Sequence, residues 1–182
     1  MSDGLRLVAP SAAMLPDYAA ALERGWSPNN LRDVAAEQLA LLRRDPAALL
    51  HDLTDQNGTV PQPDGSRKPR IPFRLFWLAD GEFCGAINLR FLPGSEDLPP
   101  HVSGHVGYAI VPWKRRRGYA TRALAVILPI ARAIGLARVL VTCDEDNIAS
   151  RKVILTNGGV PAGRERHEGA PDKLRFWVAT GQ

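Results

Sequence analysis

The 182-residue sequence predicts an α/β fold in which a sheet is covered by helices, and two observations carry this prediction. The N-terminal third places apolar residues at helical spacing. The rest of the chain alternates short apolar runs, typical of strands, with stretches of helical periodicity. This length suits a single hydrophobic core, so residues 1–182 are predicted to form one domain.

Residues 1–54 are predicted to form a helical N-terminal part in three pieces. The first helix spans about Met14 to Arg24, and Gly25 is a suitable stop. Asn30 is predicted to cap a second helix that runs from about Leu31 to Arg44. Pro46 suits the first turn of a third helix, which extends through Leu53.

Residues 55–70 are predicted to be a mobile loop. The segment is polar and contains the turn-forming pairs Asn57-Gly58 and Asp64-Gly65 together with three prolines. It is not interpreted as a domain linker, because the helices before it are too few to build a core of their own.

The remaining two thirds of the chain supply the predicted strands and two further helices. Phe73–Leu78 and Glu82–Leu92 are predicted to form an antiparallel hairpin around Ala79-Asp80-Gly81. A strand is predicted over 104–111 and another over 138–143, with helices over about 117–133 and 147–157. The last predicted strand spans 175–179 and is paired with a segment near 160–167.

Composition excludes several classes of protein. Hydrophobic residues make up 45% and charged residues 23%, and no apolar run is long enough to cross a bilayer. The first ten residues lack the features of a secretory signal. We therefore expect a cytoplasmic protein without a membrane partner. Two cysteines, Cys84 and Cys143, exclude a disulfide framework, argue against a zinc site and are expected to be buried thiols. The net charge of +4 is too mild and too dispersed to indicate a nucleic-acid partner.

The segment from His105 to Thr121 carries the chemistry. It is a predicted strand, a basic turn containing glycine and the start of a helix, where backbone N–H groups lack partners and the helix dipole is positive. Gly118 and Ala120 leave room for a pyrophosphate, and Lys114 with the three following arginines would add positive charge. The turn has neither the GxxxxGK[ST] pattern of nucleotide hydrolases nor the GxGxxG pattern of dinucleotide-binding proteins.

The pattern Arg115-x-x-Gly118-x-Ala120 resembles motif A of the GNAT superfamily of N-acetyltransferases, whose turn holds the pyrophosphate of coenzyme A. Asn147-Ile148-Ala149-Ser150 resembles the family's Asn-x-x-Ser/Ala turn, which contacts the pantetheine arm. The runs over 104–108 and 142–147 are similar to those of a group of bacterial predicted acetyltransferases. The resemblance covers residues 73–179.

The resemblance implies a mixed, largely antiparallel sheet with helices on both faces, and a primary amine, small molecule or peptide, that attacks acetyl-CoA directly in a ternary complex. No metal is implied, and a homodimer is left open. The residues that it assigns to acetyl-CoA are Ile110, Val111, Arg115, Arg116, Arg117, Gly118, Tyr119, Ala120, Thr121, Asn147 and Ser150.

Two residues are assigned to catalysis. The resemblance makes the Val111 amide the candidate donor to the oxyanion. His105 is the candidate general base, because the pKa of an imidazole lies near the working pH. The alternative for His105, a structural histidine bonded to a neighbour, carries equal weight.

The general acid is a departure from the family. The family's usual tyrosine, seven residues after the asparagine, is replaced by Ile154. The thiolate is therefore expected to leave without protein help, with Tyr108 or a water as the other options. Asn88 and Arg90 share one face of their strand and are candidates for the acceptor cleft, where an arginine suits a carboxylate; a solvated strand end is the alternative.

Ile154 also keeps a second function open, a GNAT-fold module that binds acyl-CoA without turning it over. A third function, nucleic-acid binding through residues 114–117, leaves the glycine spacing and the Asn147 turn unexplained.

Overall fold

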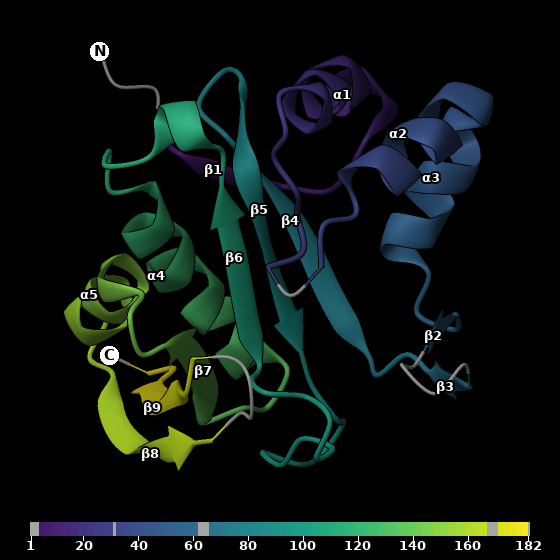
Figure 1. Ribbon diagram of the computed structural model, residues 1–182. Coiled ribbons are helices and arrows are strands. Elements are labelled where there is room, and N and C mark those ends of the chain that lie inside the picture. The colour runs from purple at the N-terminus through teal and green to yellow at the C-terminus, as the bar shows by residue number, and fades with distance from the viewer. Residues whose placement is uncertain (1–3, 31, 62–65, 167–170, 182) are drawn as a thin grey trace.

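The computed structural model describes residues 4–30, 32–61, 66–166 and 171–181 and is built around a seven-stranded sheet of order β1-β4-β5-β6-β7-β9-β8. Neighbouring strands are antiparallel except β6 and β7, which are parallel (Figure 1). The predicted mixed, largely antiparallel sheet is thereby confirmed. The strands are β1 (Arg6–Val8), β4 (Phe73–Ala79), β5 (Phe83–Arg90), β6 (Val106–Ile110), β7 (Arg138–Asp144), β8 (Val160–Glu165) and β9 (Lys173–Ala179).

Helices cover both faces of the sheet, as predicted (Figure 1). One face carries α4 (Tyr119–Ala133) and α5 (Ile148–Thr156), and the other carries α1 (Leu15–Glu23), α2 (Ala35–Arg44) and α3 (Pro46–Thr54). Side chains alternate between the two faces along each strand, so the hydrophobic core consists of two clusters, one on each face of the sheet. Ile87 and Leu89 belong to the cluster under α4 and α5, whereas Trp77 and Ala86 belong to the cluster under α1–α3.

An aromatic cluster joins the N-terminal helices to the sheet. The ring of Tyr18 from α1 stacks on Trp77 from β4 with centroids 4.7 Å apart, and Trp26 and Phe83 pack edge-on against it. Such rings bury a large apolar area, so α1 is held firmly over β4 and β5.

The second helix starts later than predicted. Helix α2 begins at Ala35, and its N-cap is Val34, whose side chain cannot accept a hydrogen bond. Leu31, the predicted start, lies outside the described residues. Asn30 is therefore not a cap. Its side-chain amide donates instead to the carbonyl of Tyr108, 3.0 Å away and 78 residues later in the chain. Helices α1 and α3 lie within two residues of the predicted bounds.

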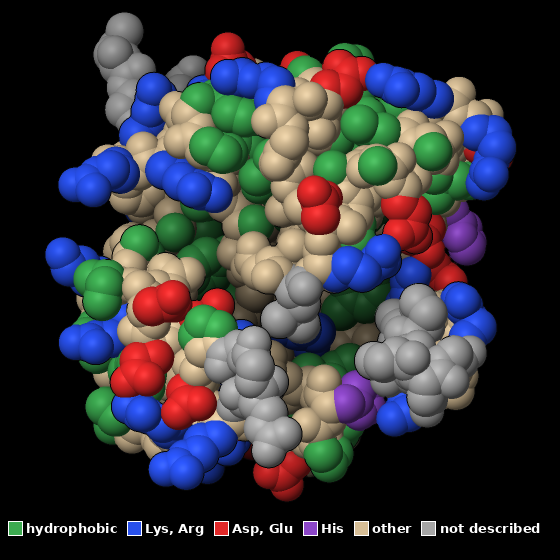
Figure 2. Space-filling model, viewed as in Figure 1, with side chains coloured by type: hydrophobic (Ala, Val, Ile, Leu, Met, Phe, Trp, Pro, Cys, Tyr) green, Lys and Arg blue, Asp and Glu red, His purple; other side chains and the backbone are tan. Residues whose placement is uncertain are grey.

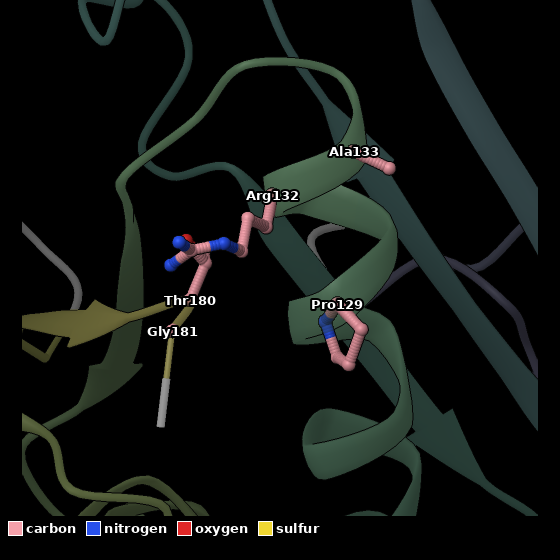
Figure 3. A pocket seen from close by; sticks show the side chains of 5 residues that line it. All are labelled: Pro129, Arg132, Ala133, Thr180 and Gly181. Carbon is pink, nitrogen blue, oxygen red and sulfur yellow. The ribbon is translucent and has the colours of Figure 1, made fainter.

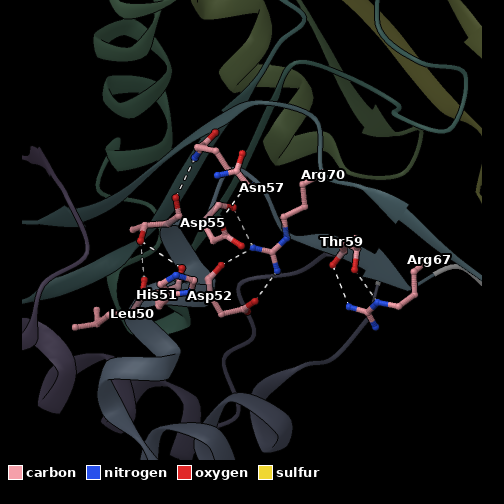
Figure 4. Close-up of polar contacts among 10 residues, drawn as sticks. Leu50, His51, Asp52, Asp55, Asn57, Thr59, Arg67 and Arg70 are labelled. Atoms are coloured by element: carbon pink, nitrogen blue, oxygen red, sulfur yellow. Dashed lines mark hydrogen bonds and ion pairs between the residues drawn. The ribbon is translucent and has the colours of Figure 1, made fainter.

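The segment over 55–70, predicted to be a loop, contains a second, two-stranded sheet made of β2 (Thr59–Pro61) and β3 (Arg67–Pro69). Figure 4 shows how it is attached to the end of α3: the guanidinium of Arg70 donates to the Asp52 carboxylate at 2.6 Å and to the backbone carbonyls of Asp52 and Asp55. Arg67 in turn donates to the Thr59 hydroxyl at 2.7 Å. The mobility of this segment stays a prediction.

The short edge strand β1 was not predicted, and it pairs with β4 from Arg6 opposite Ala79. The later strands and helices were predicted closely, including the pairing of the last strand with the segment near Val160. Both cysteines are buried free thiols, as predicted.

Candidate active site

The two parallel strands at the centre of the sheet separate soon after they meet. Only Val106 and Val141 are in register between the described parts of β6 and β7, and the His105 amide donates to the Leu140 carbonyl at 2.7 Å. Towards the carboxyl ends of the two strands no further pair is formed. A gap therefore opens within the sheet, between β6 and β7.

The peptide groups that face this gap follow from the alternation along β6. Val111 donates its amide to the carbonyl of Cys84 in β5 at 3.0 Å, so the amides of Tyr108 and Ile110 point the other way, towards the gap. The Asn30 bond to the Tyr108 carbonyl lies on this same edge. The Val111 amide, assigned to the oxyanion from sequence, is thus already engaged within the sheet.

The end of β6 leads into a tight basic turn. The turn begins with the 3-10 helix η2 (Pro112–Lys114), and Gly118 is the N-cap of α4. Arg116 and Gly118 have left-handed backbone conformations, with φ of 62° and 75°. Left-handed residues within a turn point successive backbone N–H groups to the same side, and such a concave group of amides binds anions. The N-terminus of α4, which follows directly, also favours anions.

The charge at this turn comes from exposed arginines. Arg115, Arg116 and Arg117 are exposed, and the Arg115 Nε atom donates to the Ile110 carbonyl at 3.2 Å. Figure 2 shows Lys and Arg side chains gathered at the upper left, where Figure 1 places η2 and the start of α4. Below them the surface is hollowed, with hydrophobic side chains in its depth.

Lys114 does not share in this exposed charge. It is 8% exposed, and its ammonium group lies 3.0 and 3.1 Å from the two carboxylate oxygens of Asp80 and 2.8 Å from Glu82. The Tyr119 hydroxyl also donates to Asp80. Burial by itself would raise the pKa of Asp80, but the hydrogen bonds from Tyr119 and Lys114 outweigh it and hold this pKa well below its usual range. Asp80 thus ties the hairpin between β4 and β5 to the turn.

The start of α5 lies next to β6 on one face of the sheet. Asn147 caps this helix, and its side-chain oxygen accepts from the Ser150 amide at 3.0 Å. The Tyr108 hydroxyl reaches across from β6 to within 2.8 Å of the Ser150 hydroxyl. Burial raises the pKa of Tyr108 to about 12, so this phenol stays protonated at neutral pH. Ile154 is fully buried in the core beneath α5.

His105 is fully buried at the beginning of β6, next to the point where the two strands are still joined. Its Nδ1 atom accepts from the Leu140 amide at 2.9 Å, which leaves the ring proton on Nε2. Burial, with the nearby charge of Arg90 as a second cause, lowers the pKa of His105 to about 4. The ring is thus neutral and has no free lone pair, so the geometry favours the structural alternative over a general base.

Asn88 and Arg90 share the sheet face that α1–α3 cover elsewhere. The Asn88 side chain accepts from the Gly107 amide at 3.1 Å. A Cβ atom placed on Gly107 would lie 3.5 Å from Arg90 Nη2, so the guanidinium lies over this glycine. Both side chains are therefore packed against β6, and their part in an acceptor cleft stays a prediction.

The structure adds three residues that sequence reasoning missed: Asp80, Asn30 and Arg175. Asp80 stands in a turn, where an aspartate is ordinary, and only the fold brings Lys114 to it. Arg175 lies on β9, opposite Thr142 of β7, and reaches the neighbourhood of His105 through this pairing. No local sequence signal marks these contacts.

Other features of the described residues do not compete with this site. An open depression at the far end of α4 is lined by Pro129, Arg132, Ala133, Thr180 and Gly181 and holds no acid–base pair (Figure 3). In the part of the chain that the structure describes, no group of three or more His, Cys, Asp or Glu side chains is arranged to hold a metal ion. No helix among these residues is long and apolar enough to span a bilayer.

Comparison with known proteins places this chain in a family. A profile described as an acetyltransferase (GNAT) domain matches residues 29–160, well over half of the chain. No curated protein matches the sequence.

Three solved structures illustrate the shared fold. The ribosomal L7/L12 alpha-N-protein acetyltransferase RimL, in complex with coenzyme A, is 15% identical with a TM-score of 0.64 over 98% of this chain and 96% of its own. The microcin C7 self-immunity acetyltransferase MccE, in complex with acetyl-CoA and AMP, is 11% identical with a TM-score of 0.61 over 97% and 93%. A spermidine N-acetyltransferase SpeG chimera from Vibrio cholerae and hSSAT is 14% identical with a TM-score of 0.60 over 97% and 95%. On the strength of the domain profile, the chain belongs to the GNAT family of acetyltransferases.

Proposed function

We propose that this protein transfers an acetyl group from acetyl-CoA to a primary amine. One observation carries the proposal: the gap between β6 and β7 opens directly onto the turn over 115–118, which is positively charged and holds two left-handed residues. The same few residues thus offer an anion site and, beside it, the backbone amides of Tyr108 and Ile110, which face the gap.

The turn and the gap suit the two parts of coenzyme A. A Cβ atom added to Gly118 would meet nothing within 4 Å, so the turn leaves open space above its amides. We assign the pyrophosphate to the backbone over 116–121 and to the exposed arginines. The peptide groups of Tyr108 and Ile110 would hold the pantetheine arm in strand-like pairing, with Asn147 and Ser150 on the opposite side.

The reaction forms a bond between the amine nitrogen and the acetyl carbon and breaks the bond from that carbon to sulfur. The protein's main contribution is to orient both partners and to donate hydrogen bonds to the carbonyl oxygen. Because the Val111 amide is bonded to Cys84, we move this donor role to the amides of Tyr108 and Ile110, of which Tyr108 is nearer to the point where the strands separate.

Tyr108 is our candidate for protonating the departing thiolate. Its hydroxyl lies 2.8 Å from that of Ser150, near the start of α5, and is protonated at neutral pH because burial raises its pKa to about 12. Tyr108 would then act as the general acid in place of the family's usual tyrosine, whose position is occupied by Ile154 here. The proton of the acceptor ammonium passes to water in this scheme, because His105 has no free lone pair.

The competing function is an acyl-CoA-binding module without turnover, favoured by Ile154 alone. Two of the solved structures support an amine acceptor, since one is a ribosomal L7/L12 alpha-N-protein acetyltransferase and another is a spermidine N-acetyltransferase. We also propose a cytoplasmic location, as the sequence predicts. Whether the protein forms a homodimer stays an open question.

A thiol-release assay separates the two functions. The purified protein is mixed with acetyl-CoA and a panel of primary amines, and free coenzyme A is followed with a thiol reagent. Amine-dependent release above the hydrolysis background, with the acetylated amine found by mass spectrometry, supports the enzyme. Binding of acetyl-CoA without release for any amine would favour the non-catalytic module.

A further inference from the structure

A small cavity lies on the sheet face opposite α4 and α5, beside the start of β6. Its volume is about 230 Å³. Its floor is formed by His105, just before β6, by Leu140 of β7 and by Arg175 and Trp177 of β9. Its wall is formed by the loop over 96–103 and by Glu165 of β8. It is separate from the basic turn, which lies at the other end of β6.

The floor of the cavity carries donors that have no acceptor. His105 Nε2 and Arg175 Nε are buried and have no hydrogen-bond partner among the described residues. Arg90 Nε, on the adjacent strand β5, is also buried and without a partner among these residues. Because Nδ1 of His105 accepts from Leu140, its Nε2 atom carries the ring proton and is a donor. Buried N–H groups without partners are rare and costly, so three together indicate a ligand that supplies oxygen acceptors.

The three donors are neighbours in the sheet. Arg90 donates its backbone amide to the His105 carbonyl at 2.7 Å, which places the two residues side by side on β5 and β6. Trp177 lies opposite Leu140 in the β7–β9 pairing, Arg175 opposite Thr142, and the rings of His105 and Trp177 are 6.1 Å apart. Alternation puts all of these side chains on one face.

Three acidic residues line the cavity, Glu96, Asp97 and Glu165, and the contacts of Glu96 are directed outward. Glu96 accepts from Arg138 Nε at 2.9 Å and from the Ala137 amide at 3.2 Å. Glu96 therefore serves Arg138 at the outer rim, and the Nε–H groups of Arg90 and Arg175 stay without an acceptor among the described residues. Two planar guanidinium groups and an imidazole N–H match the oxygens of a carboxylate.

We propose that this cavity binds a carboxylate group of the acceptor, so that the substrate is an amine that also carries a carboxylate. The proposal rests on the acetyl transfer proposed above and names the substrate class for the same site. It assigns Arg175 and His105 to recognition of the carboxylate, with Arg90 beside them.

The position of the cavity also sets the spacing between the two groups of the acceptor. Tyr108, the first residue whose amide faces the gap, lies three residues beyond His105, or about 10 Å along a strand. The amine and carboxylate of an α-amino acid are separated by a single carbon atom and cannot span this distance. The acceptor therefore has a chain of several carbon atoms between the two groups, as in an ω-amino acid or a lysine side chain of a compound with a free carboxylate.

The test compares matched amines. Thiol release from acetyl-CoA is measured with 6-aminohexanoate, with hexylamine, with glycine and with 5-aminopentylphosphonate. The proposal predicts that kcat/KM for 6-aminohexanoate exceeds that of hexylamine and of glycine by about 10-fold or more, as expected for hydrogen bonds to a charged group. Equal values with and without the carboxylate, or a preference for the phosphonate, would overturn it.

Variants connect the preference to the cavity. In Arg175→Gln and, separately, Arg90→Gln, the advantage of 6-aminohexanoate over hexylamine should fall to about 3-fold or less, because each variant removes a charged donor to the carboxylate. Arg164→Gln is the matched control, since Arg164 lies on the neighbouring strand β8 and pairs with Glu145 and Asp172 outside the cavity. This variant should keep the full preference.

A binding experiment decides the matter even if no amine is acetylated. Calorimetric titration with 6-acetamidohexanoate and with its primary amide measures the cavity directly, with and without coenzyme A. Binding of the carboxylate but not of the amide, weakened about 10-fold in folded Arg175→Gln protein, supports the proposal. No difference between the two compounds overturns it. Failure of the acetyl transfer would instead appear as an absence of acetyl-CoA binding or of thiol release with every amine.

Discussion

The ammonium group of Lys114 lies 3.0 and 3.1 Å from the two carboxylate oxygens of Asp80, and both side chains are about one-tenth exposed. The pair joins the hairpin between β4 and β5 to the turn that precedes α4. It gives Lys114 a structural role in shaping the turn, and the charge offered to a ligand comes from the three arginines that follow.

Substitution of Asp80 should weaken both the fold and the turn. In Asp80→Asn, Lys114 keeps only the exposed Glu82 as an ionic partner, so the free energy of unfolding is expected to fall by about 3 kcal/mol. Affinity for acetyl-CoA should fall as well, because Tyr119 and Lys114 lose their anchor. Urea denaturation and calorimetry measure the two effects. The control is Glu23→Gln, which breaks the exposed pair with Arg43 and should cost less than about 1 kcal/mol.

The buried His105 should make stability depend on pH in a defined window. The pKa of His105 is lowered to about 4 in the folded protein, from about 6.5, mainly by burial. Between these values the unfolded chain binds more protons than the folded one, so stability is complete above about pH 6.5 and falls as the pH drops towards 4. The loss from this residue is about 3 kcal/mol.

Urea denaturation at several pH values between 7 and 4 checks this expectation against His105→Gln. The variant cannot titrate at this position, so its stability should change less steeply than that of the wild type. Parallel curves for the two proteins would show that His105 is not a neutral buried ring.

The left-handed conformation at Gly118 should matter more for binding than for folding. In Gly118→Ala the added methyl group meets no neighbour, so only backbone strain of about 1 kcal/mol opposes the turn. Relief of that strain moves the amides of the turn, and affinity for acetyl-CoA should fall about 10-fold. Gly25→Ala, at φ of 80° with open space around it, should lose similar stability and keep its affinity. Equal affinities in both variants would argue against an anion site at the turn.

Removal of the Tyr108 hydroxyl tests the assignment of the general acid. Tyr108→Phe should lower kcat by about 100-fold or more, while the dissociation constant of acetyl-CoA changes by less than about 3-fold. Ser150→Ala, which removes the hydrogen-bond partner but keeps the phenol, should have the smaller effect on kcat. An unchanged kcat in Tyr108→Phe would mean that the thiolate leaves without a proton from this residue.

The elements whose apolar residues repeat over several positions were predictable from sequence. The hairpin of β4 and β5, the strands β6 and β7 and the helices α4 and α5 all show such repeats, and their observed bounds differ little from the expected ones. β1 was missed because a three-residue edge strand has no periodicity of its own and is specified only by pairing with β4. β2 and β3 were missed for the same reason, within a segment rich in turn residues.

The site was predictable where it depends on local chain geometry. The basic turn, its glycine and the Asn147 cap are local patterns, and the structure contains them. The roles of His105, Lys114 and Val111 depend on partners 20 or more residues away, namely Leu140, Asp80 and Cys84. A sequence shows that a lysine or a histidine is present, but not which buried group faces it.

The central claim is that the turn over 115–118 and the neighbouring gap bind acetyl-CoA. Calorimetric titration of the wild-type protein with acetyl-CoA, beside an Arg115→Ala, Gly118→Glu double variant of confirmed fold, measures this directly. We predict saturable one-site binding to the wild type and at least a 100-fold loss of affinity in the double variant, since a carboxylate at Gly118 repels phosphate. Absence of binding to folded wild-type protein, or equal binding by both, would contradict the account.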